Sequence, residues 1–129
     1  MDAPFQATHQ TKRMLYEMML CAEHRGAYVG YVRGEFSRTL TGFFQEVSSA
    51  FRFPSTFSWS WESLDACFRD LEWRSFSQLL WVISQPEKRF TQEEDHMAHV
   101  NALQRSIAAA ASFWRERQIP FDCVLNLFE

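Results

Sequence analysis

Residues 53–73 are the most informative stretch of this chain; they read Phe-Pro-Ser-Thr-Phe-Ser-Trp-Ser-Trp-Glu-Ser-Leu-Asp-Ala-Cys-Phe-Arg-Asp-Leu-Glu-Trp. Pro54 requires that any preceding helix has already ended. Ser60 can cap a new helix, because its side-chain oxygen can accept a bond from a free backbone N–H group. Glu62 would lie in the first turn, where the helix dipole favours an acid. The stretch therefore predicts an aromatic loop followed by a helix.

This predicted helix has one apolar side and one polar side. Its buried stripe consists of Trp61, Leu64, Cys67 or Phe68, and Leu71. The other side carries Glu62, Asp65, Ala66 and Arg69, at i, i+3, i+4 and i+7. Asp65 and Arg69 could form a simple surface ion pair. Together with the aromatic residues of the loop, however, these carboxylates match the rings and desolvated charges typical of protein interfaces.

The rest of the chain alternates between helical and strand patterns. Apolar residues recur at helical spacing over about residues 9–24 and 36–51, and apolar runs at about 27–32, 79–83 and 121–128 are typical of strands. Thr91-Gln92-Glu93-Glu94 has the form of a capping box, so we expect the longest helix to begin there. Strands separated by helices favour right-handed crossovers. The pattern predicts a small α/β domain with a three-stranded parallel sheet packed with helices.

Residues 53–73 resemble the signature of the barstar family, the intracellular protein inhibitors of bacterial ribonucleases. The order strand, helices, strand, helix, strand is also similar to that family. The resemblance covers residue 27 to the C-terminus, and it implies a barstar-like domain at 27–129. Residues 1–26 then form an extra N-terminal helical extension.

The resemblance implies a binding site on the loop and on the helix that follows it. In barstar-like inhibitors this region enters the active site of a ribonuclease, where carboxylates of the helix replace RNA phosphates. The implied contact residues are Thr56, Phe57, Trp59, Ser60, Glu62, Ser63, Asp65, Ala66 and Arg69, and we expect Glu72 to join them. The implied partner is a basic bacterial ribonuclease or a related secreted toxin, so the implied function is that of an inhibitor or immunity protein.

Several positions depart from the family signature. Glu62 matches the first contact carboxylate but is one methylene longer than the usual Asp. Ser58 and Ser60 stand where the family usually has Gly and Asn, and Ala66 stands where such inhibitors carry their central Asp. These departures weaken the case for a barnase-type target, and they leave open whether inhibition is lost or retuned to another toxin. They also leave open a barstar-fold regulatory module whose partner is not a nuclease.

Composition and charge narrow the classes of function. The net charge of −3 does not favour binding to nucleic acid or to an anionic membrane. No apolar run approaches the ~20 residues that cross a bilayer, and the first ten residues lack the apolar segment of a signal peptide. The three cysteines, Cys21, Cys67 and Cys123, show no Cys-x-x-Cys spacing and are expected to be reduced core residues of a cytoplasmic protein.

The sequence offers little for catalysis, so we expect a protein that is no enzyme and has no cofactor. It contains no nucleophile motif and no glycine-rich phosphate loop. A metal site at His96 and His99, beside the acids at 93–95, is a weaker alternative. A monomer is favoured, although an apolar stripe on the N-terminal helix could cap the sheet, pair two copies or recruit another molecule. That stripe contains Met14, Leu15, Met18 and Met19.

Overall fold

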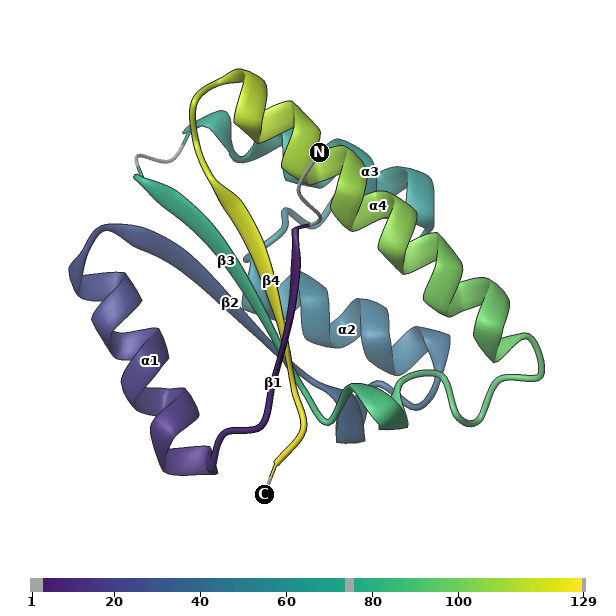
Figure 1. Ribbon diagram of the computed structural model, residues 1–129. Helices are drawn as coiled ribbons and strands as arrows, with labels where there is room; N and C mark the ends of the chain where they lie inside the picture. Colours follow the sequence, from purple (N-terminus) through teal and green to yellow (C-terminus); the bar gives the residue numbers. More distant parts are fainter. Residues whose placement is uncertain (1–3, 74–75, 129) are drawn as a thin grey trace.

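A computed structural model describes residues 4–73 and 76–128 of the chain, apart from the side chains of Glu72 and Trp73. The elements are β1 (Phe5–Thr8), α1 (Lys12–His24), β2 (Ala27–Arg33), α2 (Leu40–Ala50), α3 (Trp61–Arg69), β3 (Gln78–Ser84), α4 (His96–Glu116) and β4 (Phe121–Asn126), with 3-10 helices at Gly34–Phe36, Asp70–Trp73 and Pro86–Lys88. The strands form a parallel sheet in the order β1-β4-β3-β2 (Figure 1). The predicted α/β class is confirmed.

The prediction of three strands was wrong, because the described part of the sheet has four. The additional strand is β1, which pairs in parallel with β4 and places Phe5 opposite Cys123. β1 is four residues long and two of them, Gln6 and Ala7, are weak strand formers, so its sequence carries no clear strand pattern. It forms because β4 offers an unpaired edge.

A buried amide at the end of β4 holds the N-terminal segment in place. The side chain of Asn126 is fully buried. Its Oδ1 atom accepts hydrogen bonds from Thr8 Oγ1 at 2.8 Å and from the backbone N of Gln10 at 2.7 Å, and its Nδ2 atom donates to the carbonyl oxygen of Gln10 at 3.2 Å. Residues 8–10 are therefore tied to the C-terminal strand at the point where the chain turns into α1.

Helices cover both faces of the sheet (Figure 1). Helices α2, α3 and α4 lie on one face, and α1 lies on the other. The crossovers β2–β3 and β3–β4 step across the sheet in one direction, whereas the crossover from β1 to β2 steps in the opposite direction. Connections of the same hand must therefore place α1 on the opposite face.

The apolar stripe of α1 packs on its own sheet. Leu15 and Met19 are buried in a cluster with Leu80 and Val82 of β3, so of the alternatives left open by the sequence the stripe caps the sheet. Met14, by contrast, keeps 51% of its surface exposed.

Aromatic rings fill the core on the other face. The ring of Phe51, fully buried, lies 4.9 Å from that of Phe68 and 5.3 Å from that of Trp81. It also occupies the space that a side chain at Gly30 of β2 would need, since a Cβ atom there would be 2.3 Å from the Phe51 ring. The sheet and the end of α2 therefore approach closely at the centre of the core.

The longest helix begins later than the capping-box pattern predicts, at His96 instead of near Thr91. The hydroxyl of Thr91 donates to the carbonyl of Lys88. The carboxylate of Glu93 accepts a hydrogen bond from the backbone N of Leu40 at 2.8 Å, so it caps the first turn of α2. Neither residue caps α4, and Glu93 caps α2 instead.

Candidate functional site

Serine hydroxyls fix the loop before α3 to the start of the helix. Ser60 is the N-cap, as predicted, and its Oγ atom accepts a hydrogen bond from the backbone N of Ser63 at 3.1 Å. The Oγ atom of Ser63 in turn accepts one from the backbone N of Ser58 at 3.0 Å. Two free backbone donors are thus satisfied by the loop and the first turn together, which fixes the angle at which the chain enters α3.

Trp59 is presented to solvent on a rigid support. Its φ of 57° lies in the left-handed region, which a residue other than glycine adopts when its surroundings hold it there. Its ring stacks on that of Phe57 at 6.4 Å and retains 46% exposure. Phe57 itself is 6% exposed and packs on Phe44 of α2 at 5.8 Å. Phe57 therefore supports Trp59, whose ring lies exposed at the surface.

The exposed face of α3 consists of Glu62, Ala66 and Arg69, which lie at i, i+4 and i+7. Asp65, expected on the same side, is half-buried, and its Oδ1 atom has no hydrogen-bond partner. At 100° per residue, Asp65 lies about 60° around the helix from Glu62. Asp65 and Arg69 are both described, and no ion pair joins them. Asp65 thus stands at the border of the face with an unsatisfied carboxylate.

The remaining predicted site residues lie around this face. Thr56 is exposed on the loop. Trp61, which the sequence places on the buried stripe of the helix and outside the site, is half-buried against Phe44 at a ring distance of 5.2 Å. The side chain of Glu72 lies outside the described residues. Helix α3 is held from behind by α4, where the indole N–H of Trp114 donates to the carbonyl of Phe68 at 3.1 Å. The structure therefore brings the predicted loop and helix residues onto one rigid support.

The cysteines differ in their surroundings. Cys67 and Cys123 are buried, as predicted, but Cys21 is exposed on α1, so its assignment to the core was wrong. Burial raises the pKa of Cys123 to about 12. Burial, with Asp70 nearby, also raises the pKa of the Cys67 thiol, although a hydrogen bond with Ser63 opposes this. Both thiols are neutral at neutral pH.

We expect thiol reagents to distinguish these cysteines, since the thiolate is the reactive form and access is required. At pH 8, Cys21 should react with a chromogenic disulfide at least about tenfold faster than Cys67 or Cys123 in the folded protein. All three should react rapidly in denaturant. The measurement is the time course of thiol release, with a Cys21→Ser variant as the control that removes the fast phase. A fast phase that persists in this variant would contradict the assignment.

Among the described residues, the two histidines of the alternative metal site do not belong to a cluster of metal ligands. His96 is exposed, whereas the ring of His99 lies 6.3 Å from that of Trp61 and 5.6 Å from that of Phe90. Over residues 4–73 and 76–128, no three His, Cys, Asp or Glu side chains are placed to hold one ion. In this arrangement His99 serves as a packing ring beside the start of α3.

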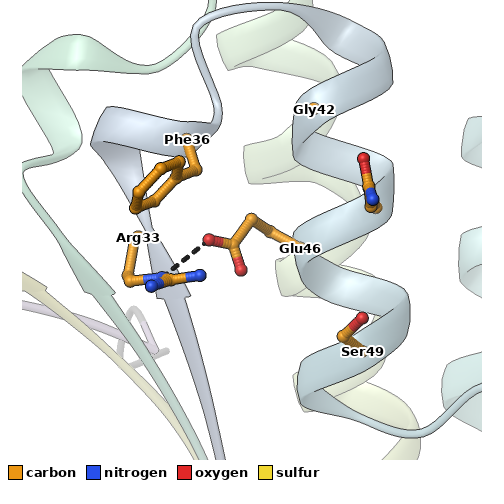
Figure 2. Close-up of a pocket in the computed structure, with 6 residues that line it drawn as sticks. Arg33, Phe36, Gly42, Glu46 and Ser49 are labelled. Atoms are coloured by element: carbon orange, nitrogen blue, oxygen red, sulfur yellow. Dashed lines mark hydrogen bonds and ion pairs between the residues drawn. The ribbon is translucent and has the colours of Figure 1, made fainter.

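Two hollows in the surface lie along β2 and α2. One, of about 300 Å³, is lined by Arg33, Phe36 and the outer side of α2 (Figure 2). A second, of about 350 Å³, lies at the other end of β2. The helices of the described chain include none with the length and apolar character needed to cross a bilayer.

The segments from β2 to β4 form a small α/β domain that presents a capped helix and an aromatic loop on its surface. A family model described as Barstar (barnase inhibitor) matches residues 27–126. The chain therefore belongs to the barstar family, and the match supports a barnase-inhibitor-like protein. The matched residues begin at β2, so β1 and α1 lie outside them. Among curated proteins, none matches the chain at a significant level.

Proposed function

We propose that this protein inhibits a bacterial ribonuclease or a related toxin by placing α3 and the loop before it in the basic active site of its target. The observation that carries the proposal is Trp59, an exposed ring stacked on a buried one, three residues before Glu62 on the exposed face of α3. A rigid aromatic anchor beside an acid combines low entropic cost with charge complementarity.

The charges of α3 suit a basic cleft. Glu62, Asp65 and Asp70 outnumber Arg69 on and around the helix, within a chain of net charge −3. Such an excess attracts a cationic partner at long range and raises the rate of association. Asp65 adds a second argument, because a cationic group of the partner would satisfy its unpartnered oxygen once the side chain turns outward.

Ala66 defines the centre of the proposed contact. Its small side chain is exposed between Glu62 and Arg69, so a partner can approach the helix closely there. We propose that a large side chain of the partner fills the space at Ala66, whereas Trp59 is the large side chain at the edge of the proposed contact. This arrangement gives a target specificity different from that of an inhibitor with a central acid.

The same residues favour a second candidate, a barstar-fold regulatory module whose partner is not a nuclease. The observation in its favour is the exposed cation Arg69 next to Ala66, since a positive charge there would repel the catalytic cations of a ribonuclease.

For the inhibitor, we propose action in the bacterial cytoplasm as an immunity protein that protects the cell from its own or a neighbour's toxin.

The proposal is tested by affinity capture from the source organism. The bait proteins are the wild type, a Trp59→Ala/Glu62→Ala/Asp65→Ala variant, and a Met14→Ala control on the opposite side of the sheet. We expect the wild type and the control to retain a basic nuclease or toxin, and added salt to release it faster. A partner retained equally by the triple variant would place the site elsewhere, and a partner without nuclease or toxin activity would favour the regulatory module.

A further inference from the structure

Strand β2 forms one edge of the sheet, and part of its backbone points outward. The backbone N of Leu79 donates to the carbonyl of Pro120, so the odd-numbered residues of β3 face β4 and the even-numbered ones face β2. Through the register of β2 with β3, the groups of Ala27, Val29 and Tyr31 then face away from the sheet. Among the described residues, no hydrogen bond reaches the backbone N–H or C=O groups of these three.

The edge lacks the features that normally prevent pairing. β2 is seven residues long, reads Ala-Tyr-Val-Gly-Tyr-Val-Arg, and contains no proline, lysine or inward charge. Its one charged residue, Arg33, stands at the very end. A long, apolar, unprotected edge is a template for another strand.

Helix α1 places an apolar flank beside this edge. The ring of Tyr16 lies 6.0 Å from that of Tyr31 in an edge-to-face contact. Leu20 and Glu23 follow Tyr16 at i+4 and i+7, so they share its side of the helix. Tyr16 is 45% exposed and Leu20 is 57% exposed. The outer edge of β2 is therefore bordered by exposed apolar side chains.

Charged side chains of both signs lie at each end of the edge. Arg33 donates to Glu46 at 2.8 Å and lies 4.3 Å from the ring of Phe36, which is 53% exposed (Figure 2). The hollow at the other end is lined by Glu23 and Arg52. Neither end of β2 therefore carries charges of one sign alone, and like-charge repulsion does not block the approach of a second strand.

We propose that β2 pairs in antiparallel fashion with β2 of a second copy, which joins the two sheets into one continuous sheet. With Val29 at the two-fold axis, Ala27 of each copy lies opposite Tyr31 of the other. All outward N–H and C=O groups of these residues then find partners. The surface is self-complementary, as a two-fold interface requires.

A second copy fits this edge better than an unrelated strand. A two-fold axis perpendicular to the sheet places both α1 helices on the same face, so Tyr16 and Leu20 meet their own counterparts across the junction. It also brings Arg33 of one copy to the end where the second copy carries Glu23. The sequence favours a monomer, and the sequence alone does not show which strand forms the edge of the sheet. The proposed dimer therefore differs from that expectation.

The test compares the mass of the protein in solution with that of two matched variants. Leu20→Lys places a charge at the junction, whereas Met14→Lys changes an equally exposed residue on the other flank of α1. By light scattering from about 1 µM to a few hundred µM, we expect a dimer whose Kd rises at least about tenfold in Leu20→Lys and less than about twofold in Met14→Lys. Circular dichroism checks that both variants are folded.

Hydrogen exchange locates the contact. The amides of Val29 and Tyr31 should be protected in the dimer and should exchange rapidly in Leu20→Lys, while Met14→Lys keeps the protection. A wild type that stays monomeric over this range overturns the proposal. So does a dimer that weakens equally in both variants, or one in which these two amides exchange freely.

Discussion

Replacing Phe51 with alanine is expected to lower the free energy of unfolding by about 3–5 kcal/mol. Phe51 is fully buried, and its ring contacts Phe68 and Trp81 and fills the space above Gly30. Removing the ring loses its transfer free energy and leaves a cavity that these large rings cannot close without leaving their own contacts. Equilibrium unfolding in urea, followed by circular dichroism and tryptophan fluorescence, measures the difference.

The matched control is Phe36→Ala, the same substitution at a phenylalanine that is 53% exposed. It removes a contact with the Arg33 guanidinium and should cost less than about 1 kcal/mol. Equal losses in the two variants would mean that Phe51 is not at the centre of the core.

Replacing Trp59 with alanine is expected to weaken binding to the target by at least about 2 kcal/mol, roughly thirtyfold in Kd. The ring is exposed in the free protein and rests on Phe57, so the variant loses partner contact while the core is left intact. Surface plasmon resonance with the captured partner measures the affinity. Most of the change should appear as faster dissociation, since a single neutral side chain contributes little to long-range attraction.

Met14→Ala serves as the control for Trp59→Ala, because it removes a similarly exposed apolar side chain, on α1, the helix that lies on the opposite face of the sheet. Its affinity should equal that of the wild type within about twofold. An unchanged affinity in Trp59→Ala, with the fold intact, would show that the aromatic loop does not carry the binding.

The parts of the fold that the sequence predicts are those with strong local patterns. The apolar runs of β2, β3 and β4, the stripe of α2 and the Ser60 cap of α3 each specify their element over a few residues. β1 could not be predicted this way, because it depends on the edge of β4 and on Asn126 at the far end of the chain. The start of α4 was misplaced for a similar reason, since Glu93 caps α2 through a tertiary contact.

The features of the site likewise divide into those that local sequence patterns predict and those that depend on tertiary contacts. The sequence places Glu62 and Trp59 in one region, and the structure gives their orientation. The left-handed backbone at Trp59 and its stacking on Phe57 depend on packing against α2, which no local pattern encodes. The helical spacing alone predicts that Asp65 lies on the exposed side of α3. Its partial burial depends on how α3 is rotated against its neighbours, which the spacing does not show.

We propose that α3 and its preceding loop block a nuclease, so a titration of nuclease activity with this protein measures the blocking itself. RNA cleavage by the captured basic partner is measured against increasing amounts of the wild type and of Trp59→Ala/Glu62→Ala/Asp65→Ala. We predict that activity falls linearly to zero at one equivalent of the wild type, and that the triple variant at the same ratio leaves it nearly unchanged. A partner that stays fully active when bound would show that the protein is not an inhibitor, and equal inhibition by both proteins would show that α3 and its loop are not the inhibitory site.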